Sequence, residues 1–257
     1  ETNEVFGRGK KRYKKRFTES AMHWRFSGGG KFQLQPTGQV VYPDFCEQHV
    51  FDDLVDQYDP LRTVWRAWDL GYTRPACVAF QMNKNGHKNI LYSILGKNVQ
   101  LTDFIDQVVA YEKEIMPEVQ SAMDLLPHDA NRKYDVSPET SAMIFKRKGL
   151  NTDVVYVKRD TSVVLTNEEL KEFNSGVPSL KFDSKHCGIL IQALSAYTRD
   201  DAGVPRRDKY FEHVSDAFKL GLFYISKKLV NDQELPVEEP QYYTDNFDTP
   251  TRERIFN

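Results

Sequence analysis

Apolar residues run almost without interruption through three consecutive stretches in the first half of the chain. Residues 65–72 (WRAWDLGY) are followed by residues 76–80 and, after the Asn85-Gly86 turn, by residues 89–95. Short apolar runs separated by turn residues are typical of antiparallel strands. Asp69 lies within the first run, where an ionised carboxylate is costly to bury unless a partner or a metal ion compensates its charge. The pattern predicts three antiparallel strands with Asp69 on the first, and an Asp that caps its own turn is the alternative.

The spacing of apolar residues changes to a helical period at residues 101–115. Residues 123–130 (MDLLPHDA) then predict a strand that leads into a loop, with Asp129 at its C-terminal end. A strand behind a crossover helix is expected to pair in parallel with an earlier strand. Because ligand sites collect at the carboxyl ends of such strands, Asp129 is a candidate site residue. Asp124 and, more weakly, Asp135 compete with it.

The remaining elements are expected from the same two periods and from turn and cap residues. They are a short strand at 38–45, a helix at 138–148, a strand at 153–157, a helix start at 166–169, and helices at 187–197 and 212–230. The last helix carries His213 and Asp216, which are three positions apart and therefore lie on one face. An Asp at a helix start is also favoured by the helix dipole alone, so Asp216 has a purely structural alternative.

Composition limits the classes of function. The 257 residues carry a net charge of −2, so a nucleic-acid contact would need a local basic patch. The densest basic run, residues 7–16 (GRGKKRYKKR), is either such a contact or a solvated arm. No apolar run approaches the ~20 residues that cross a bilayer, so we expect no membrane partner. Residues 28–31 (GGGK) lack the flanking residues of a phosphate loop, and the chain holds no complete nucleotide-binding loop.

Three carboxylates occupy related places in the predicted order of elements, β-β-β-α-β-α-β-α-α. Asp69 is on the first strand, Asp129 ends the fourth, and Asp216 is on the final helix. This order resembles the ribonuclease H-like fold, an α/β fold with a mixed central sheet of three antiparallel strands and then parallel strands, flanked by helices. Three carboxylates gathered together repel one another unless divalent cations lie between them. Oxygen ligands suit Mg²⁺ or Mn²⁺, and two such cations can support hydrolysis of a phosphodiester.

Several motifs in collinear order resemble the nuclease domain of the large terminase subunits of tailed bacteriophages. They are GQVVYPDF at 38–45, WDLGYTRP at 68–75, PHDA at 127–130, LKFDSKHCGI at 180–189, and HVSDAF at 213–218. The resemblance implies an endonuclease that cuts concatemeric double-stranded DNA at the start and end of genome packaging. It places the metal-binding aspartates on Asp69, Asp129 and Asp216, with His213 as an accessory residue and two divalent cations, Mg²⁺ or Mn²⁺.

The resemblance also implies a setting for the protein. It predicts a nuclease domain at residues 38–230, a segment or linker from the absent ATPase motor at 1–37, and an extended tail at 231–257. The expected partners are double-stranded DNA, the portal protein and the small terminase subunit. The expected location is the cytoplasm of the infected bacterial host.

Two other interpretations remain open on the sequence. Junction resolvases and transposase-like enzymes share the acidic triad, and a DNA-binding or portal-docking module could carry an incidental acidic cluster. Basic residues before the last helix could line a DNA groove in any of these cases, or belong to a solvated loop. They are Arg199, Arg206, Arg207 and Lys209.

Overall fold

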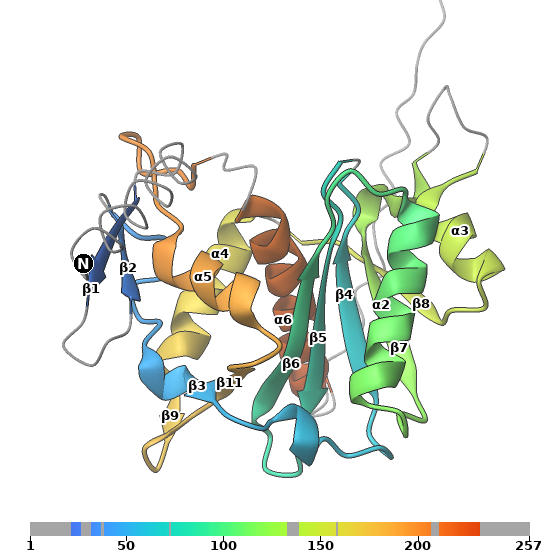
Figure 1. Cartoon of the computed structure of the whole chain (residues 1–257), viewed down its shortest axis with the longest axis horizontal. Coiled ribbons are helices and arrows are strands. Elements are labelled where there is room, and N and C mark those ends of the chain that lie inside the picture. Colours follow the sequence, from blue (N-terminus) through green and yellow to red (C-terminus); the bar gives the residue numbers. More distant parts are fainter. Residues whose placement is uncertain are drawn as a thin grey trace, which may run out of the picture.

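A seven-stranded sheet lies at the centre of the protein in a computed structural model (Figure 1). The structure describes residues 22–26, 32–36, 39–71, 73–132, 139–157, 159–206 and 211–231. The order across the sheet is β3 (Val50–Phe51), β11 (Leu180–Asp183), β6 (Lys88–Leu95), β5 (Ala76–Met82), β4 (Val64–Asp69), β7 (Ala122–Pro127) and β8 (Thr152–Val155). Strands β4, β5 and β6 pair antiparallel, as predicted. The other pairs are parallel, including the predicted β4–β7 pair.

Helices cover both faces of the sheet, with α2 and α3 on one side and α4, α5 and α6 on the other (Figure 1). Their bounds are α2 Leu101–Ile115, α3 Ser141–Arg147, α4 Arg159–Lys171, α5 Gly188–Ala196 and α6 Glu212–Asn231. The described part of the chain also contains three short 3-10 helices: η1 Glu47–His49, η2 Val55–Gln57 and η3 His128–Asn131. Two small hairpins in it lie outside the main sheet: β1 (Met22–Phe26) pairs with β2 (Phe32–Pro36), and β9 (Phe173–Asn174) pairs with β10 (Val177–Pro178). Among the described helices, none has the length and apolar character needed to cross a membrane.

Strand β4 is apolar on both faces because both are covered by helices. Trp65 and Ala67 belong to the core beneath α4, α5 and α6, whereas Val64 and Trp68 belong to the core beneath α2 and α3. Side chains alternate between the two faces of a strand. Asp69, the last residue of β4, therefore continues the series that faces α6.

Helix α6 lies directly on β4 and β5 because Gly221 leaves room for them. A Cβ atom at Gly221 would lie 2.3 Å from Cε2 of Phe80 and 2.9 Å from Cβ of Ala67. Phe218, almost one turn earlier on α6, stacks on the Phe80 ring with centroids 5.7 Å apart. This close contact fixes the height of α6 above the sheet and thereby brings the start of the helix to the end of β4.

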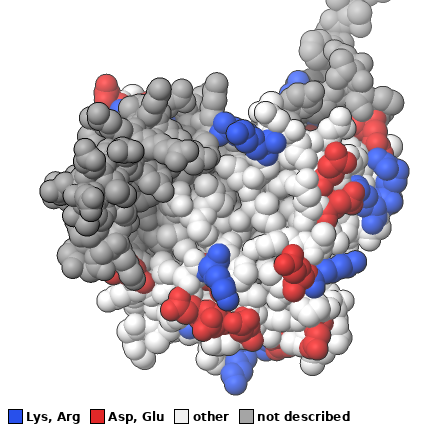
Figure 2. Space-filling model, in the orientation of Figure 1, with Lys and Arg blue, Asp and Glu red and all other residues white. Residues whose placement is uncertain are grey.

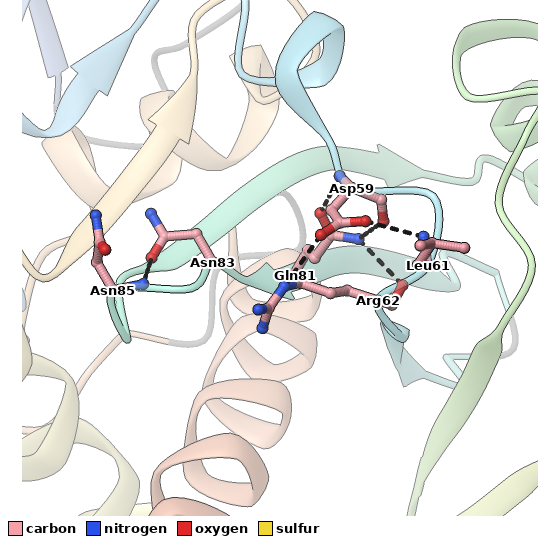
Figure 3. Close-up of polar contacts among 6 residues, drawn as sticks. All are labelled: Asp59, Leu61, Arg62, Gln81, Asn83 and Asn85. Atoms are coloured by element: carbon pink, nitrogen blue, oxygen red, sulfur yellow. Dashed lines mark hydrogen bonds and ion pairs between the residues drawn. The ribbon is translucent and has the colours of Figure 1, made fainter.

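The loop that enters β4 is held by a side chain from β5 (Figure 3). The buried Gln81 amide donates to the carbonyl oxygens of Asp59 and Arg62, at 2.8 and 3.1 Å, and accepts from the Asp59 backbone N–H at 2.8 Å. Asp59 in turn accepts from the Leu61 N–H at 3.0 Å and from Nε of Arg62 at 3.2 Å. These bonds anchor the start of β4, at the opposite end of the strand from Asp69.

Asp124, the competitor of Asp129, belongs to a buried ion-pair cluster on the α2 face. Its carboxylate accepts from Nη2 of Arg66 at 2.6 Å and from Nε1 of Trp68 at 2.8 Å. Arg66 also contacts Glu112 of α2 at 3.2 Å, and Tyr92 donates to Glu112 at 2.8 Å. Asp124 is fully buried. Its partners identify it as a structural carboxylate.

Two sequence-based expectations about secondary structure are wrong. The strand expected at 38–45 is absent from its described part, residues 39–45, where Val40 makes only an isolated bridge with Thr198. Pro43 helps to explain this, because proline has no N–H to donate to a neighbouring strand. Residues 166–169 lie inside α4 rather than at its start. The Thr166 hydroxyl donates to the Ser162 carbonyl at 2.8 Å and does not cap a helix.

The other predicted elements are confirmed with shifted ends. The helix predicted at 138–148 is α3, which begins after Thr140, and the hydroxyl of Thr140 accepts from the Met143 N–H at 3.2 Å. The strand predicted at 153–157 is β8, and the last two helices are α5 and α6. Strands β3 and β11 were not predicted, and β1 and β2 fall within the segment expected to be a linker. The basic run at 7–16, residues 28–31, Asp135 and the tail from 232 lie outside the described residues.

Candidate active site

Asp69 and His213 meet at the carboxyl end of β4. Oδ2 of Asp69 accepts a hydrogen bond from Nδ1 of His213 at 3.0 Å, and Oδ1 accepts from the Gly71 backbone N–H at 3.2 Å. Their side chains are 22% and 27% exposed, so both can reach a ligand. The sequence predicted both residues as site residues, and the fold brings them together across 144 positions.

Gly71 makes room for the imidazole of His213. A Cβ atom at Gly71 would lie 2.9 Å from Cε1 and 3.0 Å from Nδ1 of His213, and 2.9 Å from the Arg74 carbonyl oxygen. Two of these contacts are with the ring itself, so a larger residue would displace it from Asp69. The turn after β4 therefore needs glycine for close approach, a role that its place in the sequence does not reveal.

The Asp69–His213 pair has perturbed proton affinities. Burial raises the pKa of the Asp69 carboxyl above its usual range. The hydrogen bond from His213 lowers this pKa and the charge of Asp216 raises it, but burial has the largest effect. The hydrogen bond to Asp69 raises the pKa of His213, against the effect of burial. Perturbed groups of this kind gather at functional sites, although structural pairs also show them.

Asp216 lies almost one turn beyond His213 on α6. Its charge raises the pKa of the Asp69 carboxyl, so the two carboxylates lie within electrostatic range of each other. Oδ1 of Asp216 is 2.5 Å from Nζ of Lys219 on the next turn of the helix. The Asp216 side chain is 36% exposed, whereas that of Lys219 is only 4% exposed.

Asp129 lies in η3, directly after β7 and at the same edge of the sheet. It is exposed, and its carbonyl oxygen accepts from the Arg132 N–H at 2.9 Å. A cavity of about 210 Å³ lies beside it. The cavity is lined by Pro127 and His128 after β7, Val155 and Val157 from β8 onward, Ser162 of α4, and Asp216, Lys219 and Leu220 of α6. The neighbour of Asp129, His128, thus shares a cavity with Asp216.

The carboxylates suit a divalent cation in chemistry but do not form a closed cage. Within the described ranges, no group of three or more His, Cys, Asp or Glu side chains is close enough to hold a metal ion. Asp69 and Asp216 supply carboxylate oxygens, the ligands that Mg²⁺ and Mn²⁺ prefer, and both are partly exposed. The donor types therefore fit such a cation. In the described part of the chain, Asp69 pairs with His213, but no hydrogen bond or ion pair joins Asp129 to Asp69, His213 or Asp216.

The predicted basic residues lie on the segment before α6. Arg206 is exposed, and its Nε donates to the Arg199 carbonyl at 3.0 Å, while Arg199 bonds the Gly203 carbonyl at 2.9 Å. Arg207 and Lys209 lie outside the described residues. Figure 2 shows acidic and basic side chains interspersed on the face turned to the viewer, with wide uncharged areas between them.

Comparisons with known proteins bear on the fold. No protein-family model matches the chain, and no curated protein matches it by sequence. Among solved structures, the nuclease domain of the P22 large terminase superposes with a TM-score of 0.57 and 13% identity, covering 74% of this chain and 92% of that domain. The chain has the fold of this terminase nuclease domain. The predicted ribonuclease H-like arrangement of mixed sheet and flanking helices is thereby confirmed.

Two other matches have lower TM-scores. The large terminase of bacteriophage HK97 has a TM-score of 0.43 and 11% identity, and the match covers 63% of this chain and 39% of that one. A manganese-soaked terminase nuclease domain of human cytomegalovirus has a TM-score of 0.40 and 11% identity, covering 66% of this chain and 88% of that one. At these scores they add no weight to the likeness with the P22 domain.

Lys219 lines the cavity beside Asp216 and was not among the residues predicted from the sequence. Its spacing of three from Asp216 on a predicted helix was a usable signal, because such residues share a face. Most pairs at this spacing are solvent-exposed and worth little. The burial that distinguishes Lys219 depends on which elements pack against α6.

Proposed function

We propose that this chain is a metal-dependent endonuclease domain that cuts double-stranded DNA. The observation that carries the proposal is the pairing of Asp69, at the end of the central strand, with His213, near Asp216, in the fold of a terminase nuclease domain. Asp124 is sealed in the core by its partners, whereas Asp69 and Asp216 are partly exposed and Asp216 lines the cavity. Such carboxylates can bind a ligand without unfolding the protein.

In this proposal, Asp69, Asp216 and Asp129 bind two divalent cations, Mg²⁺ or Mn²⁺. When bound, the cations supply charge stabilisation and activate water for in-line displacement at phosphorus. His213 and the Gly71 N–H hold the Asp69 carboxylate in one orientation, which lowers the cost of ordering it when ligands bind. Asp129 is supplied by η3 beside the cavity, where its exposed side chain is free of the core packing that fixes Asp124.

The sequence resemblance supports a more specific role. We propose that the domain belongs to a large terminase subunit and cuts concatemeric viral DNA at the start and end of genome packaging, in the cytoplasm of an infected bacterium. An ATPase motor, the portal protein and the small terminase subunit would be its partners. Arg206, Arg207 and Lys209, together on the segment that leads into α6, are the proposed DNA contacts.

The deciding experiment is plasmid cleavage. Purified protein is incubated with supercoiled plasmid and Mn²⁺ or Mg²⁺, with EDTA as the metal-free control. We expect nicking and linearisation that depend on the metal and fall at least about a hundredfold in Asp69→Asn. Asp56→Asn, a matched loss of an exposed carboxylate on η2, is expected to cleave normally. Cleavage that survives Asp69→Asn would place the active site elsewhere.

Two further substrates separate the competing interpretations. Preference for a four-way junction over a linear duplex would favour a resolvase. Intact plasmid in both metals, with a gel shift of duplex DNA in EDTA that Asp69→Asn leaves unchanged, would favour a binding module without nuclease activity.

A further inference from the structure

Lys219 is unusual because it is a cavity-lining residue whose side chain is almost fully buried. Its side chain is 4% exposed, although lysines at this spacing on a helix normally extend into water. Within the described ranges, its ammonium group pairs with one oxygen of Asp216, at 2.5 Å. Burying an ammonium group is costly unless a partner compensates its charge, and Asp216 is that partner.

The charge balance of the cavity changes when Asp216 takes up another ligand. With Asp216 alone, the ammonium of Lys219 is neutralised by one carboxylate. If a divalent cation shares that carboxylate, as the proposed function requires, the cavity carries an excess of positive charge. An anion is then needed beside Lys219, and the phosphate of a DNA strand is the anion that the proposed reaction brings.

The other walls of the cavity strengthen such an interaction. Pro127, Val155, Val157 and Leu220 are apolar, and polar contacts are stronger where water is excluded. The cavity opens at the carboxyl ends of β7 and β8, the edge that also carries Asp69. A phosphate placed there would lie between α6 and the ends of the strands.

We propose that the ammonium group of Lys219 binds a phosphate oxygen of the DNA strand in this cavity while it holds Asp216 in position. The inference rests on the proposed function, which it deepens by naming a substrate-binding residue. A solely structural Lys219 would neutralise Asp216 and make no contact with DNA, and the two cases differ in the salt dependence of DNA binding.

The test measures binding of a labelled duplex by fluorescence anisotropy from about 50 to 200 mM salt. Ca²⁺, which prefers oxygen ligands as Mg²⁺ does, is present throughout so that a divalent cation can share Asp216. Each phosphate contact steepens the slope of log affinity against log salt by about one. We expect Lys219→Met to bind severalfold more weakly and to lose about one unit of slope, and Lys219→Arg to restore the slope. Lys227→Met is the matched control, because Lys227 is exposed about two turns further along α6 and lies over the Phe223 ring.

A folded Lys219→Met protein with the wild-type slope would overturn the inference, as would absence of duplex binding by the wild-type protein. Thermal melting checks the fold, and Lys219→Gln is the second neutral variant if Lys219→Met does not melt cooperatively. An unchanged slope together with metal-dependent plasmid cleavage would contradict the phosphate contact of Lys219 and still support the proposed nuclease activity. A reduced slope together with cleavage that survives Asp69→Asn would support the phosphate contact of Lys219 and contradict the proposed active site at Asp69.

Discussion

Two ionic clusters share strand β4 and differ in what they can do. Arg66, whose side chain is 5% exposed, faces α2 and pairs with Asp124, which is 0% exposed. Asp69, only three residues later, faces α6 and pairs with His213, and their side chains are 22% and 27% exposed. One strand thus carries a sealed ion pair on one face and an accessible pair on the other.

The difference shows how burial separates structural charges from reactive ones. Burial lowers the pKa of the Arg66 guanidinium, but the carboxylates of Asp124 and Glu112 outweigh it and raise the pKa overall. Each group in that cluster needs the others, because an unpaired charge in the core is expensive. Asp69 and Asp216 have solvent beside them, so they can exchange a protein partner for a ligand.

The largest expected effect breaks the sealed cluster. Arg66→Met leaves Asp124 and Glu112 buried without their cation, and we expect the free energy of unfolding to fall by about 3–5 kcal/mol. Asp69→Asn is the matched change in the accessible cluster. Burial already disfavours the Asp69 carboxylate, so its loss should change the free energy of unfolding by less than about 1 kcal/mol. Urea denaturation measures both values, and similar losses in the two variants would contradict the distinction.

A smaller effect tests how the accessible cluster is brought to the sheet. Gly221→Ala forces a methyl group against the Phe80 ring, and we expect a loss of about 1–3 kcal/mol because the core is overpacked. Gly188→Ala is the control, since a Cβ at the start of α5 meets no atom within 4 Å. Wild-type stability in Gly221→Ala would mean that α6 can move away from β4 without cost.

The smallest effect concerns the protonation of the accessible pair in metal-free protein. Because the hydrogen bond to Asp69 raises the pKa of His213 above its value of about 6.5 in an unfolded chain, this pairing stabilises the fold fully below that pH. The contribution is lost as pH rises through the raised pKa. An NMR titration in EDTA should show a lower pKa of His213 in Asp69→Asn. An unchanged pKa would mean that the hydrogen bond does not control this group.

Much of the fold could be predicted because local patterns repeat over many residues. Apolar runs marked β4, β5 and β6, and helical spacing marked α2, α5 and α6. Strand β3 was missed because its 2 residues are too few to show a period, and β11 because its 4 residues include the charged Lys181 and Asp183 instead of a continuous apolar run. The helix start expected at 166–169 was wrong because the same residue types that cap a helix can bond within it.

The candidate site, like the fold, has features that the sequence could predict and features that it could not. The sequence by itself determined that Asp69 lies on a buried strand and that His213 and Asp216 share one helix face, because both follow from the periods of strand and helix. Only the tertiary structure decided that Asp124 is neutralised by Arg66, that Gly71 lies against His213, and that Lys219 is buried beside a cavity. These facts depend on contacts between segments far apart in the chain, and the periodicity within one segment carries no information about which distant side chain will compensate a charge.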